Sequence, residues 1–350
     1  MLDIDEAAKR LKLGGIVAIP TETVYGLAAD ATKLLAIQEI FTIKKRPLDN
    51  PLIVHIGSLE QLGEISKRLM ELELSIIKKL WPGPLTLLLP RRTTVLDAVT
   101  AGLETVAVRM PNHRLCLDLL QKTGPLVAPS ANLSGTPSPT KKEHVLSDFG
   151  EDFPVLDGGI CSIGLESTVL SCRPSYFMTT EGNKLNYPYK ASHNNMIIYR
   201  PGAISAEQLS EFGSVKYYTS NQIEQDATSS SKNIPSPGLK YRHYAPKAKI
   251  VWLSNIEQLK GTQLNSIVLL LDNLIPDIKD FLEQSTDHGF HLVYCEGTWE
   301  RFGQLLYDTF RIADLENYTH IFVQDIRRHP FSNDLKEALI NRIEKAISGH

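Results

Sequence analysis

The chain has 350 residues, 42% of them hydrophobic and 22% charged, and its net charge at neutral pH is -3. This length is long for one domain and suits two. The near-neutral charge excludes a generally basic nucleic-acid binder, so any contact with nucleic acid has to be local.

The N-terminus is acidic and lacks a long apolar run, so we expect no signal peptide. No stretch approaches the ~18 apolar residues of a membrane span. The four cysteines have neither CxxC spacing nor a histidine at zinc-ligand distance, and they are Cys116, Cys161, Cys172 and Cys295. We interpret them as buried apolar residues in a reducing compartment, and we predict a cytoplasmic protein without a membrane partner.

The first elements run from Asp3 to Pro20. Asp3 and Glu6 form a capping-box pattern that predicts a helix, and Gly14-Gly15 ends it. The apolar run Ile16 to Ile19, stopped by Pro20, predicts a buried strand. A polar turn, Thr21 to Gly26, follows this strand.

A helix with an apolar face is expected next, and it ends in the basic run Lys44-Lys45-Arg46 before an apolar strand from Leu52 to Ile56. Threonine hydroxyls and a cationic cluster therefore follow two neighbouring buried segments. This combination favours a site for an anionic, hydroxyl-bearing small molecule, because strand ends are where open α/β sheets place ligands. The alternative is a solvated helix terminus beside a simple turn.

The middle of the chain alternates helices and strands. Ser58 to Leu80 predicts two helices, and apolar strands are expected at Leu85 to Leu89 and at Thr105 to Arg109. Leu126 to Ala128 leads into a Pro-Ser-Ala-Asn turn, where serine and asparagine are usually turn formers or helix caps. None of the glycines in the chain fits a Walker A loop or a dinucleotide fingerprint, so a nucleotide would be held by dispersed groups.

After a strand at Met196 to Tyr199, residues 203–247 become polar and rich in serine and proline, which predicts a linker with one short helix from Ser205. Its end, Lys240 to Tyr244, is aromatic and cationic. We hypothesise that this segment covers the site as a lid; the alternative is that its tyrosines hold two domains together.

The last hundred residues alternate four short apolar strands with helices, which predicts a parallel, Rossmann-like sheet without the glycine fingerprint. The expected strands are Lys249 to Leu253, Ser266 to Leu271, Phe290 to Tyr294 and His320 to Val323, and the strongest helices are Trp299 to Leu315 and Asp334 to Ile347.

Four motifs in order resemble the YrdC-like domain of threonylcarbamoyl-AMP synthases: PTETVYGL, KKRPLDNPLIVHI, APSANLSG and LESTV. PGLKYRHYAP, at Pro237 to Pro246, resembles the interdomain linker of the long form of this family. The resemblance implies an α/β chain with a YrdC-like twisted open sheet and helices in residues 1–202, a linker with a lid-like segment in 203–247, and a smaller Rossmann-like domain in 248–350.

The resemblance implies a nucleotidyltransferase that converts L-threonine, bicarbonate and ATP into L-threonylcarbamoyl-AMP and pyrophosphate. The product would pass to a separate transferase that modifies tRNA next to the anticodon, with at most a weak direct contact to tRNA. The chain shows no carboxylate cluster for a metal, so Mg²⁺ would arrive on the nucleotide phosphates.

Matching the motifs residue by residue implies three sets of site residues. The catalytic set is Lys44, Arg46, Ser130 and Asn132. The residues for ATP are Arg46, Asn50, Thr105, Ala128, Ser130, Asn132, Arg200, Tyr241, His243 and Tyr244. The residues for L-threonine are Thr23, Tyr25, His55, Arg109, Ser167 and Thr168.

Two other functions stay open at this point. YrdC-like domains also resemble proteins with a cationic concave face, so a double-stranded RNA-binding or ribosome maturation module is the main alternative, although the overall acidity counts against it. A carbamoyl-transfer enzyme with another acceptor is the second; it would carry zinc-finger-like or acylphosphatase-like segments, which the sequence lacks.

Overall fold

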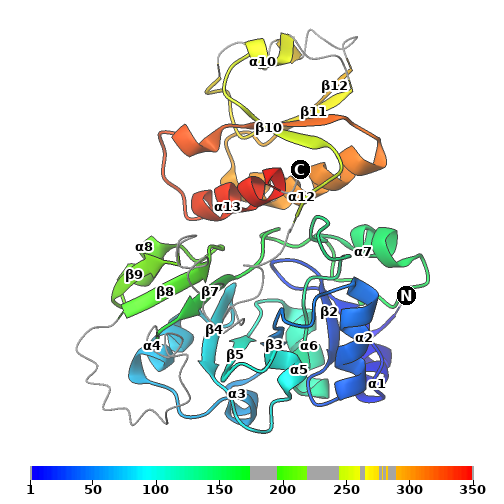
Figure 1. The fold of residues 1–350 in the computed structure, drawn as a ribbon, viewed down its shortest axis with the longest axis vertical. Helices are drawn as coiled ribbons and strands as arrows, with labels where there is room; N and C mark the ends of the chain where they lie inside the picture. The colour runs from blue at the N-terminus through cyan, green and yellow to red at the C-terminus, as the bar shows by residue number, and fades with distance from the viewer. Residues whose placement is uncertain are drawn as a thin grey trace.

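The computed structural model describes residues 2–173, 195–218, 244–260, 265–275, 278, 281–282 and 289–348. Within these ranges the strands form two sheets, one of nine strands and one of four. Figure 1 shows the larger sheet with its helices in the lower part of the molecule and the smaller one above it. In the part of the chain that the structure describes, no helix combines the length and the apolar composition needed to cross a membrane.

The larger sheet has the strand order β1-β2-β6-β3-β5-β4-β7-β8-β9 and mixes parallel and antiparallel pairs. Its strands are β1 (Val17–Ile19), β2 (Gly26–Asp30), β3 (Ile53–His55), β4 (Leu85–Pro90), β5 (Thr105–Arg109), β6 (Leu126–Val127), β7 (Thr168–Ser171), β8 (Asn195–Arg200) and β9 (Ser214–Tyr217). The central strands are buried along their whole length, as their apolar runs predict.

The helices of this first region are α1 (Ile4–Lys12), α2 (Leu34–Lys44), α3 (Leu59–Ile65), α4 (Glu71–Leu80), α5 (Asp97–Thr100), α6 (Arg114–Thr123), α7 (Lys142–Phe149) and α8 (Ala206–Ser210). The capping box at Asp3 and Glu6 is confirmed. Helix α2 ends where Lys45 adopts a left-handed conformation with φ of 51°. That turn leaves Lys44 buried and Lys45 exposed.

Two strands of the larger sheet differ from expectation. The sequence analysis ends the polar turn at Gly26 and predicts no strand there, yet β2 follows at once. Its GLAAD sequence is made of small residues without the β-branched side chains that signal a strand. Strand β9 lies in the segment assigned to the linker and pairs in parallel with β8. It is largely exposed because it is an edge strand, so its composition is that of a linker.

The smaller sheet has the order β10-β13-β11-β12 with every pair parallel, which confirms the Rossmann-like expectation. Its strands are β10 (Lys249–Leu253), β11 (Ser266–Leu270), β12 (Phe290–Tyr294) and β13 (His320–Gln324). Its other elements are α10 (Glu257–Lys260), α12 (Trp299–Leu315), a 3-10 turn η2 (Ile326–Arg328) and α13 (Lys336–Ile347). Figure 1 shows α12 and α13 between this sheet and the first region.

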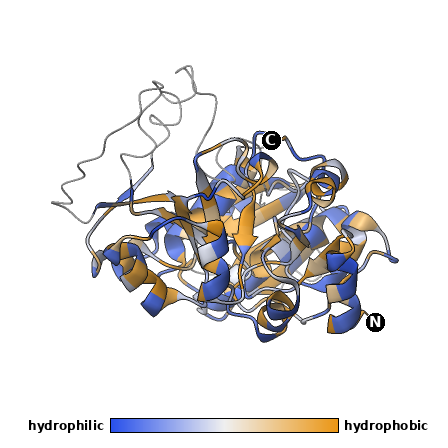
Figure 2. Cartoon of the chain, turned by 90° about the horizontal axis from the view of Figure 1, so that it is seen from below, coloured by the Kyte–Doolittle hydropathy of each residue, from blue (hydrophilic) through white to orange (hydrophobic). Residues whose placement is uncertain are grey.

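Hydrophobic residues are concentrated on the central strands, and the helices carry both hydrophobic and hydrophilic residues (Figure 2). The core of the second region also takes in two residues of the first, Val24 and Leu165. Backbones meet there as well: a Cβ on Gly164 would lie 2.6 Å from the Gly303 carbonyl oxygen of α12. The second region is therefore docked closely on the loop that precedes β7.

Candidate active site

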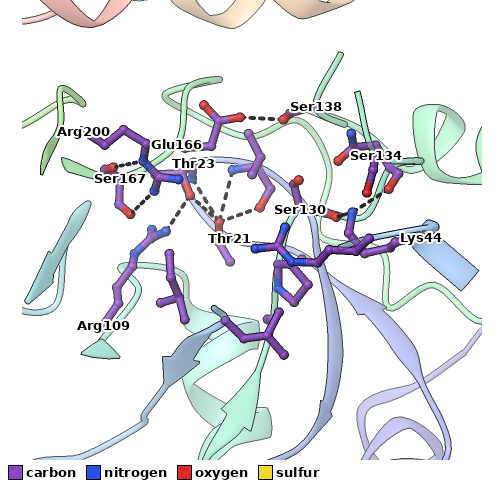
Figure 3. A pocket seen from close by; sticks show the side chains of 18 of the residues that line it. Thr21, Thr23, Lys44, Arg109, Ser130, Ser134, Ser138, Glu166, Ser167 and Arg200 are labelled. Carbon is purple, nitrogen blue, oxygen red and sulfur yellow. Dashed lines mark hydrogen bonds between the residues drawn. The ribbon is translucent and has the colours of Figure 1, made fainter. Parts of the chain in front are cut away.

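A pocket opens at one edge of the larger sheet, where β3, β5 and β8 end and β4 and β7 begin. Thr21 and Thr23 enter it from the turn after β1, and Lys44 comes from the end of α2. Arg109 and Arg200 close β5 and β8. Figure 3 shows Arg109 directed toward Thr23 and Arg200 toward Ser167, with Lys44 on the other side of the view beside Ser130. Strand ends thus bring hydroxyls and cations together, as the sequence analysis expects.

One end of the pocket is built around Arg109. Its Nη1 donates to Thr23 Oγ1 at 2.7 Å and its Nε donates to the Gly83 carbonyl at 3.2 Å. Thr21 Oγ1 lies 2.8 Å from Thr23 Oγ1, so the two hydroxyls and the guanidinium form one chain. The network fixes a positive charge beside two hydroxyls in a nearly dry environment.

Arg109 also forms a buried ion pair with Glu22, with 2.5 Å between Arg109 Nη2 and Glu22 Oε2. The contact is an ion pair and not a hydrogen bond, since neither Glu22 oxygen nor Arg109 Nη2 has a hydrogen-bond partner among the described residues. We interpret the pair as charge compensation: both side chains are at most 5% exposed, and a lone buried charge is costly.

His55, at the end of β3, faces the same part of the pocket. Burial and the nearby Arg109 charge lower the pKa of His55 to about 3. The imidazole is therefore neutral near pH 7. Its Nδ1 lies 3.2 Å from the Ile53 carbonyl oxygen, which fits an Nδ1-H tautomer with Nε2 as the acceptor.

Arg200 and Ser167 form a second polar group. Arg200 Nε donates to the Ser167 carbonyl and Arg200 Nη2 to Ser167 Oγ, both at 3.0 Å. Ser167 Oγ also lies 2.7 Å from Thr86 Oγ1. The adjoining Gly202 leaves room for this arrangement, because a Cβ there would lie 2.2 Å from the Thr168 amide nitrogen.

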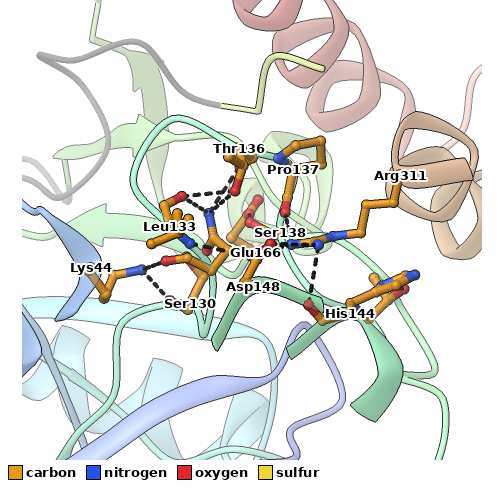
Figure 4. A network of polar contacts seen from close by, with 12 residues as sticks. Lys44, Ser130, Leu133, Thr136, Pro137, Ser138, His144, Asp148, Glu166 and Arg311 are labelled. Atoms are coloured by element: carbon orange, nitrogen blue, oxygen red, sulfur yellow. Dashed lines mark hydrogen bonds and ion pairs between the residues drawn. The ribbon is translucent and has the colours of Figure 1, made fainter. Parts of the chain in front are cut away.

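Lys44 does not offer a free charge to the pocket. Its ammonium group donates to the carbonyl oxygens of Ser130 and Asn132, both at 2.5 Å (Figure 4). Burial, together with the Arg46 charge, holds the pKa of Lys44 well below its usual value. Lys44 therefore fixes the turn that follows β6.

Within that turn, the Asn132 side-chain nitrogen donates to the Leu133 and Thr136 carbonyls at 2.8 and 2.9 Å. Its buried Oδ1 has no hydrogen-bond partner among the residues that the structure describes, and it can act as an acceptor. Arg46 lines the pocket beside this turn, with Nη2 donating to the Pro51 carbonyl at 2.7 Å.

Most of the predicted site residues meet in this pocket. They are Thr23, Lys44, Arg46, His55, Arg109, Ala128, Ser130, Asn132, Ser167, Arg200 and Tyr244. Two others, Tyr241 and His243, lie outside the described residues together with most of the lid-like segment.

Four predicted site residues are not among those that line the pocket, and their contacts with a substrate stay predictions. The Tyr25 hydroxyl donates to the Gly159 carbonyl at 2.8 Å, and Thr168 Oγ1 donates to the Ile204 carbonyl at 2.8 Å. Asn50 is buried and accepts Arg46 Nε through its backbone carbonyl. Thr105 begins β5 and so lies roughly 13 Å from its Arg109 end. For Tyr25, Asn50 and Thr168, an adjacent residue of the motif lines the pocket and the side chain itself does not.

Several polar residues of the site had no predicted role. They are Thr21, Glu22, Ser134, Ser138 and Glu166. Four of them lie inside the quoted motifs, but the sequence shows no partner for their side chains. Ser138 had no signal at all, since a serine between prolines is typical of any loop.

The arrangement concentrates cationic and hydroxyl groups and holds few carboxylates. Glu166 lines the pocket, but its oxygens accept from Ser138, Tyr307 and Arg342. Among the described residues, no group of three or more His, Cys, Asp or Glu side chains is arranged to hold a metal ion. The pocket is therefore suited to an anionic ligand with hydroxyl groups.

Two family models match the chain. Residues 9–179 match a family described as "Telomere recombination", which groups Sua5, YciO and YrdC proteins, and residues 204–348 match the C-terminal domain of threonylcarbamoyl-AMP synthase.

Relatives with that name match most of the chain. A threonylcarbamoyl-AMP synthase of Pyrococcus abyssi is 42% identical over 343 residues, which is 97% of this chain and 92% of that protein. One of Bacillus subtilis is 43% identical over 251 residues, 71% of this chain and 65% of that protein. The crystal structure of P. abyssi Sua5 complexed with L-threonine has a TM-score of 0.78 at 33% identity and covers 99% of this chain and 94% of its own. Both domains and their enzymatic character are thereby accounted for: the chain belongs to the threonylcarbamoyl-AMP synthase family of enzymes, in its long two-domain form.

Proposed function

We propose that the enzyme makes L-threonylcarbamoyl-AMP and pyrophosphate from L-threonine, bicarbonate and ATP. The observation that carries this proposal is the pocket, in which Arg46, Arg109 and Arg200 surround a set of fixed hydroxyls. A relative with the same two-domain fold has been crystallised with L-threonine, which supports an amino-acid substrate here.

L-Threonine binds at the Arg109 end of the pocket. Thr23, Arg109 and Ser167 supply hydroxyls and a fixed positive charge for its carboxylate and hydroxyl, and neutral His55 supplies an acceptor. Because these groups are buried and already oriented, an amino acid without the hydroxyl leaves polar atoms unpaired. We therefore expect valine to be rejected more strongly than serine.

ATP binds between Arg46 and the turn after β6, whose Ser130 and Asn132 carbonyls accept from Lys44. Guanidinium groups grip phosphate with two parallel hydrogen bonds, so Arg46 is our choice for the phosphate contact. The free Asn132 Oδ1 cannot bind a phosphate oxygen, since both are acceptors. It fits a ribose hydroxyl or the Mg²⁺ that accompanies the phosphates.

The chemical step joins two anions. Bicarbonate condenses with the threonine amine to give a carbamate and water, and the carbamate oxygen then attacks the α-phosphorus of ATP while pyrophosphate leaves. Because this step needs no covalent enzyme intermediate, the pocket residues act by positioning and by charge stabilisation. The adenylate then passes to a separate transferase that modifies tRNA next to the anticodon.

Pyrophosphate release tests the proposal. The purified chain is supplied with ATP and each of threonine, serine and valine, with bicarbonate present or removed. We expect release to require bicarbonate and to follow the order threonine, serine, valine. Equal release with valine, or no release with any amino acid, would refute the reaction.

A further inference from the structure

Glu166 connects the pocket to the second domain. Its carboxylate accepts from Arg342 Nε at 2.7 Å and from the Tyr307 hydroxyl at 3.1 Å, and these residues belong to α13 and α12. Ser138 Oγ donates to the same carboxylate at 2.5 Å. Figure 3 shows Glu166 and Ser138 directed toward each other on the rim, close to Ser167. A pocket residue therefore has its charge partner in another domain.

Arg342 contacts both sides of the pair formed by Ser167 and Arg200. Its Nε binds Glu166, the residue before Ser167, and its Nη2 donates at 2.9 Å to the carbonyl of Pro201, the residue after Arg200. The side chain is fully buried, and its guanidinium lies 5.3 Å from the Tyr244 ring centre. Its position is thus fixed from three directions.

The charges explain what Arg342 does for the pocket. Burial alone would raise the pKa of Glu166, but the charges of Arg342 and Arg200 outweigh it and hold the value at about 2. Without Arg342, an ionised Glu166 would draw on Arg200 instead. It would also oppose an anionic ligand a short distance away, in a medium of low dielectric constant.

We propose that Arg342 of the second domain is a positioning residue for the first domain's pocket: it cancels the charge of Glu166 and holds Ser167 and Arg200 where they meet the substrates. The proposal rests on the proposed function, because it assumes that the pocket binds a nucleotide anion. On this account the second domain completes the site without touching the reacting atoms.

The domain interface has a second ion pair that provides a matched comparison. Arg311 of α12 donates to both oxygens of Asp148, at 3.1 and 2.8 Å, and to the Pro137 carbonyl (Figure 4). Asp148 does not line the pocket. If Arg342 served only to hold the domains together, loss of either arginine would have the same consequences.

The test measures ATP binding by calorimetry on the full chain, together with thermal unfolding. Replacing Arg342→Met leaves the buried charge of Glu166 without the counterion that contacts it and in competition for Arg200, so we expect ATP affinity to fall at least about ten-fold. Arg311→Met breaks an ion pair of the same interface, and we expect a smaller loss of ATP affinity for a similar loss of thermal stability.

The double variant Glu166→Gln with Arg342→Met removes the uncompensated charge, and we expect it to recover most of the affinity. The variant Arg342→Lys keeps the positive charge and covers the case in which Arg342→Met does not fold. We expect the lysine variant to bind ATP more tightly than the methionine variant. If the methionine variant does not fold, we expect the lysine variant to fold. Two results would overturn the proposal. One is wild-type ATP affinity in Arg342→Met. The other is an equal loss of ATP affinity in the lysine and methionine variants that adding Glu166→Gln does not relieve. Failure of the wild type to bind ATP would instead refute the proposed function.

Discussion

Polar side chains lie at the ends of parallel strands in both sheets, but the two groups differ in how many of their polar atoms have hydrogen-bond partners. After β11 and β13, Asp272 accepts from Gln324 at 2.7 Å and pairs with His329 at 2.8 Å. Gln324 Oε1 in turn accepts the amides of Leu271 and Asp272. These groups satisfy one another.

In the pocket of the first domain, some buried polar atoms have no hydrogen-bond partner among the described residues. Within the described part of the chain, Asn132 Oδ1 and Arg109 Nη2 are buried and have no hydrogen-bond partner, although Arg109 has its charge compensated by Glu22. Buried polar atoms are normally paired, so these two atoms give the pocket hydrogen-bonding capacity that a ligand can use. Among the described residues, unpaired buried atoms also occur away from the pocket, at His113 Nδ1, Ser266 Oγ and Arg311 Nε. What distinguishes the first domain is that two of its unpaired atoms lie together in one polar pocket.

The largest effect is expected from Arg109. Changing Arg109→Met removes the charge at the threonine end and leaves Glu22 buried without its counterion. We expect threonine-dependent pyrophosphate release to fall by at least about 100-fold and stability by ~3–5 kcal/mol. The companion variant Glu22→Gln with Arg109→Met separates the two effects: stability should recover in part, whereas activity should not. Recovery of both would assign Arg109 a purely structural role.

A ten-fold effect is expected at the basic run. Arg46→Ala removes a guanidinium that lines the pocket, and turnover should fall at least about ten-fold. Lys45, next to it in sequence, is exposed and points elsewhere because of its left-handed backbone. Lys45→Ala should therefore be nearly neutral in the same assay. If the two variants have equal activity, the run is only a solvated helix end.

The domain interface should show acid sensitivity that depends on Glu166. Its folded pKa of about 2 is below its ordinary value of 4.5, so its contribution to stability is present above about pH 4.5 and is lost as the pH falls toward about 2. Thermal unfolding of the wild type and of Glu166→Gln should differ most near neutral pH, and the gap should narrow between about pH 5 and about pH 3. A gap that does not change with pH would contradict this assignment.

The smallest effect is expected in the second domain. Asp272→Asn weakens the contacts to His329 and Gln324, which should cost roughly 1–2 kcal/mol of stability. Pyrophosphate release should stay at the wild-type level, because these groups serve only one another. A matching loss of activity at full stability would show that this strand edge also takes part in the reaction.

Much of the fold was predictable because its signals are local. Apolar runs placed β5, β10 and β12 at their observed bounds, and Asp3 with Glu6 marked the start of α1. β2 was missed because its GLAAD sequence carries no strand preference, and β9 because an exposed edge strand has the composition of a linker.

Most of the predicted residues that line the pocket, such as Arg46 and Asn132, lie within the quoted motifs. Tyr25 lies in a motif too, but its hydroxyl donates to Gly159, 134 residues away, and no local pattern records that contact. The partner of Glu166 could not be found for a similar reason. Arg342 lies 176 residues further along the chain, and no local pattern records a contact between domains.

The most direct measurement follows the carbon of bicarbonate. The purified enzyme is incubated with ATP, L-threonine and isotopically labelled bicarbonate, and the adenylates are separated and analysed by mass spectrometry. We expect a threonine-containing AMP adduct that carries the label and does not form when threonine or bicarbonate is omitted. An adduct without the label, or consumption of ATP that is independent of threonine, would contradict the proposed function.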